Sequence, residues 1–396
     1  MQATPFGTTV REFRDRSRPR YVRIDVLLLL AVVGLTVCSL YAIGTATEDD
    51  RPGSPNYFLY RQALYAAVGM TLMLLIARFD YTRLREWKAG LYALLIASIL
   101  AVFALGSVSL GARRAIELPF FEIQTSELGK VLLILSLSAV LVDRVRRIGD
   151  RETTSRAMLL VLVPAMLVIA QPDLGSGLVY ISIGLVTLFV AGTKLSHFAV
   201  LAALAAMAMT IVLVLAPAAD VELLKPYQMD RLTSFIDPSE DQEGDGYQQQ
   251  QSQVAIGAGG KTGRGDDATQ TKLDFLPEHH TDFVFSVVGE EFGFMGAAIV
   301  LSLFALLIWR TLRILTMSKD LFGTLIAAGV LAMLMHQIFI NVGMAIGIMP
   351  ITGVTLPLMS YGGSSVLVTF IALGLLQSVH AQARETAFAK GPGLVT

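Results

Sequence analysis

The fold is decided by the stretch Phe275-Leu-Pro-Glu-His-His-Thr-Asp282-Phe-Val-Phe-Ser-Val-Val-Gly-Glu290-Glu291, in which a polar turn runs directly into a long apolar segment. After Glu291, no charged residue occurs before Arg310. Such a run is long enough to cross a bilayer core, which needs about 20 apolar residues. An acid at membrane depth is costly, so Asp282 at the mouth of this segment marks a candidate functional site.

The whole chain has the composition of a membrane protein. Hydrophobic residues make up 54% of it and charged residues only 16%, with a mean hydropathy of +0.61, whereas soluble domains are about 25% charged. The apolar runs are long and do not alternate, which favours membrane helices over a barrel. The net charge of −1 gives no field that attracts nucleic acid, and the single cysteine, Cys38, lies in an apolar run as a small core residue.

These runs predict an all-α polytopic membrane protein with about ten transmembrane helices, each near the ~20 residues of a bilayer core. The turn Gln171-Pro-Asp-Leu-Gly-Ser176 separates the fifth helix from the sixth, because proline and glycine interrupt helices. The arginine-rich leader has no small-residue cleavage site after it, so we expect it to be retained. The predicted spans are 24–44, 59–78, 88–106, 127–143, 157–173, 175–192, 198–217, 283–309, 322–343 and 363–380.

Lysine and arginine predict the orientation, since they accumulate in cytoplasmic segments. They crowd the leader, residues 1–23, and the second, fourth, sixth and eighth connections. We therefore expect a transmembrane domain over 24–380, a cytoplasmic tail over 381–396, and both termini in the cytoplasm. Three irregular segments then lie on the outer side of the membrane: 107–126, the large extracytoplasmic loop 218–282, and 346–362.

Two of these outer segments have a distinctive composition. The loop 218–282 is long enough to be functional or disordered, and its Gln248–Gln251 run adds low complexity. The segment Met349–Ser365 is apolar, yet its prolines and glycines prevent a single helix. Since non-helical backbone at membrane depth is tolerated only inside protein or along a cavity, we expect a broken, re-entrant cavity wall before the last helix, with a plain tight turn as the alternative.

The acids of the opening stretch each have two interpretations. Thr281 suits a helix N-cap, which would place Asp282 in the first turn, where an acid complements the helix dipole. Alternatively, Asp282 is a general base at the outer face of the membrane. Glu290, about two turns deeper, is either a satisfied structural acid or a group that binds a cation or substrate. The residues alone leave both choices open.

Two arginines lie on the predicted outer side, against the orientation rule. Arg113 and Arg114 suit a phosphate-bearing ligand, because guanidinium groups bind phosphate in a fork geometry. The alternative is local pairing with Glu117 or Glu122.

Two further groups could handle an anion. Glu127 and Lys130 are three residues apart on one helix face and are expected to pair. The glycine-rich run Gly257–Gly265, with Lys261 and Arg264, could cradle an anion through its backbone amides, although flexible loops are also rich in glycine.

Taken together, the motifs resemble the SEDS family (shape, elongation, division and sporulation), which includes RodA and FtsW. The resemblance rests on the opening stretch, on Gln171-Pro-Asp-Leu-Gly175 and on Pro350-Ile-Thr-Gly353 with Ser360-Tyr-Gly-Gly-Ser364, and it covers about residues 23 to 380. Ala255-Ile-Gly-Ala-Gly-Gly260 makes the chain more similar to RodA, with FtsW next.

The resemblance implies a peptidoglycan glycosyltransferase of the bacterial cytoplasmic membrane that polymerises lipid II beside a class B penicillin-binding protein. It implies that Asp282 is the essential catalytic aspartate. Ala115 and Thr125 depart from the family pattern, which has tryptophan and proline there, and Asp266 and Asp267 form a short acidic linker. The candidate substrate-binding residues are Arg113, Arg114, Glu127, Lys130, Asp173, Lys261, Arg264, Glu290, Ser360 and Ser364.

The implied reaction suits a single carboxylate. A sugar hydroxyl needs a base, whereas a leaving pyrophosphate needs charge stabilisation more than a proton. Arg113, Arg114, Lys130 or a divalent cation such as Mg²⁺ would supply that charge, and no other cofactor is expected. The alternatives are a lipid II flippase or ion-coupled transporter, a non-catalytic scaffold for the penicillin-binding protein, and a division-specific polymerase of the FtsW type.

Overall fold

The computed structural model describes residues 24–47, 54, 56–109, 112–118, 121–219, 229, 231, 233–235, 244–272 and 275–389. Within these residues, ten helices are long and apolar enough to cross a membrane, which confirms the predicted architecture. They are α1 (Val26–Ala46), α2 (Tyr57–Arg78), α3 (Lys88–Leu105, preceded by the 3₁₀ turn η1, Tyr81–Trp87), α4 (Thr125–Asp143), α5 (Arg151–Ala170), α6 (Leu174–Ala191), α7 (Leu195–Thr210), α12 (Val284–Met317), α13 (Leu321–Ala345) and α14 (Gly363–Ala389). The 3₁₀ helix η2 (Val145–Arg147) follows α4. The π-helix η3 (Ile211–Leu215) and α8 (Ala216–Ala218) continue α7, so its membrane span is Leu195–Ala218.

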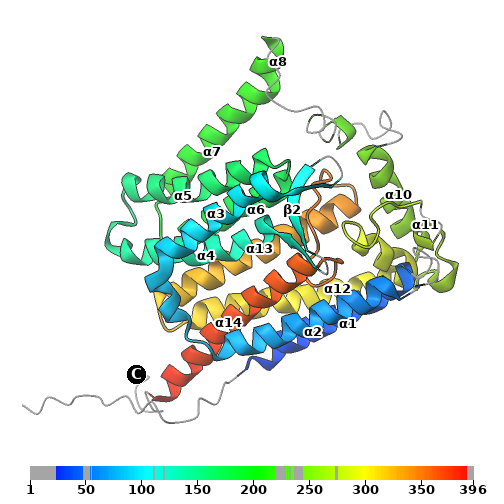
Figure 1. Ribbon diagram of the computed structural model, residues 1–396, viewed down its shortest axis with the longest axis horizontal. Helices are drawn as coiled ribbons and strands as arrows, with labels where there is room; N and C mark the ends of the chain where they lie inside the picture. The colour runs from blue at the N-terminus through cyan, green and yellow to red at the C-terminus, as the bar shows by residue number, and fades with distance from the viewer. Residues whose placement is uncertain are drawn as a thin grey trace, which may run out of the picture.

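The helices differ in how deeply they lie in the bundle. In the most apolar stretches of α4 and α14, 83% of the stretch is buried inside the protein, and in that of α13 78% is. In α7 none of the corresponding stretch is buried. Figure 1 shows α7 projecting from the rest of the bundle. Close contacts between helices use glycine: a Cβ on Gly329 of α13 would lie 2.8 Å from the side chain of Ile134 of α4. Small residues of this kind let membrane helices approach closely.

The first and last helices are joined at one end of the bundle. Asp25 caps α1 by accepting a hydrogen bond from Leu28 N at 3.1 Å, and its carboxylate forms an ion pair with Arg310 of α12. Gln377 of α14 accepts from Asp25 N at 2.8 Å and donates to Asp25 O at 3.1 Å. We call this the Asp25 end. α12 continues past the predicted residue 309 to Met317, and Arg310, which makes this ion pair, lies in the added part.

The opposite end, which carries Asp282, contains a small antiparallel sheet that the sequence analysis missed. Its strands β1 (Ser107–Ser109), β2 (Ala112–Leu118) and β3 (Phe121–Gln124) lie in the order β1-β2-β3. The prediction of an irregular segment over 107–126 was therefore wrong. Strands this short carry little periodicity, and their pairing needs the packed helices around them. Ser364 of α14 covers the outer edge of β3, because its hydroxyl donates to Glu122 O at 2.5 Å and accepts from Gln124 N at 3.0 Å.

The described part of the long loop is ordered into α10 (Asp245–Ala258), η4 (Gly265–Asp267) and α11 (Thr269–Lys272). The glutamine run lies in α10. Gln249 is buried and donates to Met349 O at 3.0 Å, and Ser252 on the same face is buried and donates to Ala345 O at 2.7 Å. Residues three apart share one face of a helix, so the run presents a polar face to α12 and α13.

The connection from α13 to α14, residues 346–362, is non-helical, as predicted for the broken segment, and most of residues 351–360 are buried. Side chains of the surrounding helices donate to several of its backbone carbonyls. Ser39 of α1 donates to Met359 O at 2.7 Å, and Gln62 of α2 donates to Ser360 O at 3.2 Å. Irregular backbone persists at membrane depth only with such partners. The segment is a buried wall, and a plain tight turn is excluded.

Candidate active site

Asp282 lies in a turn before α12, not in its first helical turn. The helix begins at Val284 with Phe283 at the N-cap position and no side-chain cap, so the predicted N-cap at Thr281 was wrong. The cause is Glu278, whose φ of +52° turns the chain back. Its carbonyl accepts from the backbone N–H groups of Thr281, Asp282 and Phe283 at 3.1 to 3.3 Å, which closes the turn before the helix can start.

The Asp282 turn is fixed to the broken segment. The side-chain amide of Asn341 on α13 donates to Asp282 O and to Val354 O, both at 2.8 Å. The Asp282 side chain is half-buried, and a Cβ placed on Gly353 would lie 3.7 Å from Asp282 Oδ2. Gly353 has a φ of +69°, a conformation that glycine adopts at no steric cost. One carboxylate oxygen therefore faces the glycine backbone of the broken segment.

Aromatic rings surround this turn. Tyr361 N donates to His280 O at 2.9 Å. The ring centroid of Phe58 lies 4.8 Å from that of His280 and 5.2 Å from that of Tyr361. Burial, followed by the neighbouring Tyr65, raises the pKa of Tyr361 to about 12. The phenol of Tyr361, like an ordinary tyrosine, is neutral at physiological pH, and burial keeps it so to higher pH.

Arg61 brings a cation to the same end of the bundle, and the sequence analysis missed it. Its guanidinium lies 5.2 Å from the ring centroid of Tyr57 and donates a hydrogen bond to the Tyr57 hydroxyl. A signal was available: Tyr57, Arg61 and Tyr65 are spaced by four residues along α2, so they share one helix face. Short sequence motifs do not show which residues share a helix face.

The predicted pair of Glu127 and Lys130 is present and buried. Lys130 Nζ lies 2.5 Å from Glu127 Oε1, and both side chains are almost fully buried in the first turns of α4. In this arrangement Glu127 already balances the charge of Lys130. A substrate anion would have to share the ammonium group with Glu127.

Asp173 joins two helices at this end. Its carboxylate caps α6 by accepting from Ser176 N at 3.0 Å. It also accepts from Ser126 Oγ at 2.9 Å and from the amide of Gln124 at 3.4 Å, both at the start of α4. Asp173 is therefore buried because it joins the start of α6 to the start of α4.

Glu290 and Glu291 bind different parts of the chain. Glu290 is fully buried and accepts hydrogen bonds from α11 of the long loop, as its interpretation as a structural acid requires. Glu291 accepts from Thr45 Oγ1 of α1 at 2.5 Å. The two acids therefore tie α12 to the loop on one side and to α1 on the other.

The glycine-rich run packs against α12 rather than forming an open cradle. The amide of Gly263 donates to Gly259 O at 2.8 Å and that of Arg264 to Glu290 O at 2.9 Å, so neither amide points to a ligand. Lys261 and Arg264 remain exposed, and the Arg264 guanidinium donates to Thr269 Oγ1 at 3.1 Å. The two side chains are therefore accessible to an anion, whereas the amides of Gly263 and Arg264 are not.

The remaining predicted residues have the following positions. Ser360 is buried, and its hydroxyl accepts from Leu356 N at 2.8 Å; Ser364 bonds to the edge of β3, as described above. Arg113 and Arg114 lie in β2, and their side chains are outside the described residues. Among the residues that the structure describes, no group of three His, Cys, Asp or Glu side chains could hold a metal ion. The Mg²⁺ expectation stays a prediction.

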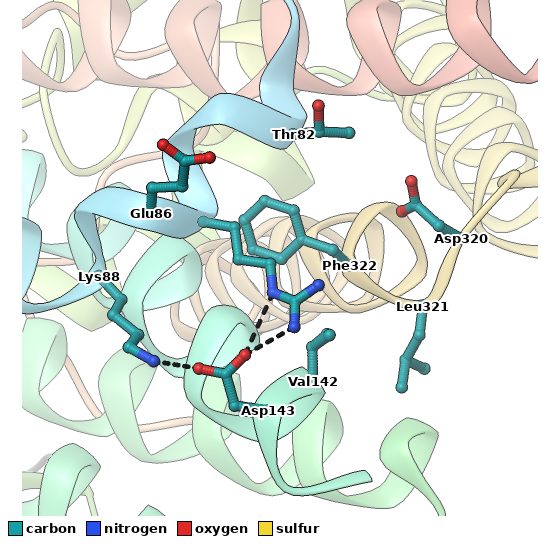
Figure 2. Close-up of a pocket in the computed structure, with 9 residues that line it drawn as sticks. Thr82, Glu86, Lys88, Val142, Asp143, Asp320, Leu321 and Phe322 are labelled. Carbon is teal, nitrogen blue, oxygen red and sulfur yellow. Dashed lines mark hydrogen bonds and ion pairs between the residues drawn. The ribbon is translucent and has the colours of Figure 1, made fainter. Parts of the chain in front are cut away.

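A pocket of about 460 Å³ lies away from Asp282, between η1, the end of α4 and the start of α13. Figure 2 shows Lys88 directed at Asp143 inside it. Arg85 lies 2.7 Å from Asp143, and Lys88 pairs with the other carboxylate oxygen. None of the predicted site residues lines this pocket. The candidate active site is therefore the Asp282 end, where the turn, the broken segment and α2 meet.

These features define a class of protein: a ten-helix membrane protein with one half-buried aspartate held by a broken segment at one end. The profile of the FTSW_RODA_SPOVE family, described as cell cycle protein, matches residues 22–385. The probable peptidoglycan glycosyltransferase FtsW of Thioalkalivibrio sulfidiphilus is 38% identical over 376 residues, covering 92% of this chain and 91% of that protein. The peptidoglycan glycosyltransferase MrdB of Escherichia coli K12 is 35% identical over 360 residues, covering 91% and 94%.

A solved structure agrees with the sequence matches. A chain of a peptidoglycan synthase complex, described as coordinating polymerization and crosslinking, superposes with a TM-score of 0.77 at 32% identity, covering 92% of this chain and 99% of that chain. The chain belongs to the FtsW/RodA/SpoVE family, which is the SEDS family, and it is a glycosyltransferase.

Proposed function

We propose that the chain polymerises lipid II into peptidoglycan strands, with Asp282 as the general base. The observation that carries the proposal is the attachment of the Asp282 turn through Asn341 to Val354 of the broken segment. This attachment holds the half-buried carboxylate beside the glycine backbone of the broken segment. A rigidly placed base of this kind contributes about 10²–10⁴-fold to a rate.

The reaction requires one proton acceptor and one charge-stabilising group. The 4-hydroxyl of the acceptor sugar would transfer its proton to Asp282 as its oxygen bonds to C1 of the donor sugar. The bond from C1 to the pyrophosphate breaks at the same time, and undecaprenyl pyrophosphate leaves with the electron pair. The paired carboxylates of glycosidases are unnecessary because this leaving group is already a stable anion.

Cations near Asp282 would stabilise the departing pyrophosphate. Arg61 is the described cation that lies with the aromatic rings of this end. Lys130 would contribute less, since Glu127 already pairs with it. Arg113, Arg114 or a divalent cation such as Mg²⁺ complete the proposal, as guanidinium groups and metal ions both suit diphosphates.

We propose the cellular location, the partner and the physiological role from the charge pattern and from the similar proteins. We place the Asp282 end at the outer face of the bacterial cytoplasmic membrane and both termini in the cytoplasm, as the arginine distribution predicts. A class B penicillin-binding protein is the proposed partner, supported by the similar chain from a complex that couples polymerization to crosslinking. A role in cell elongation is proposed from the RodA-like motifs, and a division role remains the second candidate because of the similarity to FtsW.

The test is polymerisation of labelled lipid II by the purified protein with its partner, with crosslinking blocked. Asp282→Asn should lower the turnover by about 10²-fold or more while the protein still folds. Asp267→Asn, an exposed acid in the same loop, serves as the matched control. Equal polymer from Asp282→Asn and the wild type would refute the base assignment. Lipid II translocation in vesicles without any polymer would favour the flippase instead.

A further inference from the structure

The Glu290 carboxylate is saturated by the long loop. Its Oε1 accepts from Gln270 N at 2.8 Å, and its Oε2 accepts from Thr271 N at 3.0 Å and from Thr271 Oγ1 at 2.7 Å. Glu290 is 0% exposed and Thr271 is 2% exposed, so these bonds form away from water. A buried carboxylate needs such donors, and here all three come from α11.

Through α11, this contact reaches the chain that carries Asp282. Gln270 O accepts from Leu276 N at 3.2 Å, which closes the loop just after α11. Leu276 belongs to a small hydrophobic cluster with Phe283, Met344 and Ile351. Phe283 is the residue after Asp282, and Ile351 lies in the broken segment. The position of Leu276 therefore influences both sides of the Asp282 carboxylate.

A second attachment holds the same loop to α12. The helix is interrupted at Gly293, whose φ is 62° and ψ is −158°. Backbone N–H groups just after the interruption donate to carbonyls of the loop rather than to carbonyls of α12. Phe294 N donates to Gly260 O at 2.9 Å and Met295 N to Lys261 O at 3.1 Å. The loop is thus bound to α12 on both sides of Gly293, by backbone on one side and by Glu290 on the other.

We infer that Glu290 is a positioning residue that holds Asp282 at its catalytic distance and does not bind substrate. The inference rests on the proposed role of Asp282. Without the carboxylate, the buried donors of α11 lose their partner, so α11 and Leu276 shift and the Asp282 turn shifts with them. A displacement of about 1 Å at a reacting group can reduce a rate by roughly 10²-fold.

Two variants test this contact in the lipid II polymerisation assay. Glu290→Gln keeps the shape but replaces one accepting oxygen with a donor, and it should lower kcat about tenfold or more. Thr271→Val removes a single hydroxyl donor and should lower kcat several-fold. Both should leave KM within about twofold and the pH dependence of kcat unchanged, because the base itself is intact.

The matched control is Thr45→Val, which removes the equivalent hydroxyl contact to the adjacent acid, Glu291. It should keep kcat within about twofold of the wild type. Because Glu290→Gln and Thr271→Val act on the same bond, the double variant should be no worse than Glu290→Gln alone.

The outcomes distinguish a positioning role of Glu290 from a substrate-binding role. A raised KM with unchanged kcat in Glu290→Gln would show that Glu290 contacts substrate, and unchanged kinetics in both variants would show that the loop does not position the base. Either result overturns the inference. If Asp282→Asn retains full activity, the proposed function fails first, whatever the behaviour of Glu290.

Discussion

The side-chain amide of Asn341 and the backbone carbonyl of Asp282 are 2.8 Å apart, and the same nitrogen donates to Val354 O at 2.8 Å. Asn341 is 0% exposed. It therefore joins three parts of the chain, namely α13, the Asp282 turn and the broken segment, through a side chain that water does not reach. Buried polar links of this kind specify one arrangement, because each lost bond leaves a group unsatisfied.

Asn341→Leu should affect both stability and turnover. The Val354 carbonyl, which is buried, and the partly buried Asp282 carbonyl lose their donor. An unsatisfied buried group costs about 1–3 kcal/mol, and the Asp282 turn is released from the broken segment. We expect a lower melting temperature and a fall in kcat for lipid II polymerisation. Met335→Leu on the same helix, at a side chain that is 49% exposed, should change neither. A normal kcat in Asn341→Leu would show that the turn is held elsewhere.

Gly293→Ala should destabilise the attachment of the loop to α12. The backbone there is in a region that essentially only glycine adopts, and an added Cβ would lie 2.4 Å from Gly263 N. Strain of this kind costs about 1–3 kcal/mol, before the clash is counted. Thermal unfolding in detergent measures the loss.

The control for that substitution lies in α10. Gly257 is exposed, and an added Cβ would meet no atom within 4 Å. Since alanine is preferred to glycine inside a helix by up to about 1 kcal/mol, Gly257→Ala should be neutral or stabilising. Equal melting temperatures for the two alanine variants would contradict the account of the Gly293 contact.

The sequence predicted the number of spans and the broken segment because both follow from local chemistry. Long apolar runs and the prolines and glycines of 349–365 determine what the backbone can do without reference to distant residues. The Glu127–Lys130 pair was also predictable, since its members are three residues apart on one helix.

The rest of the site depended on long-range packing. The Thr281 cap was wrong because Glu278, in a left-handed conformation, closes the turn before the helix. The contacts of Asn341 with Val354 and of Glu290 with Gln270 join segments that no spacing rule connects. Position in the chain could not show that Glu290 binds the long loop whereas Asp282 does not lie in the helix.

Tyr361 should lose its proton at an unusually high pH. Burial disfavours its phenolate and raises its pKa from the ordinary 10 to about 12. The unfolded chain would lose this proton near pH 10 while the folded protein keeps it, so the stabilising contribution is complete below pH 10 and is lost as the pH rises towards 12. The difference in phenolate absorbance between wild type and Tyr361→Phe isolates this one group. A midpoint near 10 in that difference would contradict its burial.

The buried pair of Glu127 and Lys130 should behave differently from an exposed one. Lys130→Met leaves a buried carboxylate without its partner, which costs about 3–5 kcal/mol, and the melting temperature should fall steeply. The double variant Lys130→Met with Glu127→Met removes both charges and should recover most of that loss, since apolar replacements of buried pairs are often neutral. Arg156→Ala disrupts the pair with Glu152, whose side chains are 55% and 63% exposed, and should cost about 0–1 kcal/mol.

Activity then separates packing from substrate binding at the same pair. If Lys130 helps to stabilise the pyrophosphate, the double variant will regain its melting temperature but not its kcat for lipid II polymerisation. If the pair only joins the first turns of α4, stability and activity will recover together. The second result would remove Lys130 from the substrate-binding residues and leave Arg61 as the described cation beside the aromatic rings of the Asp282 end.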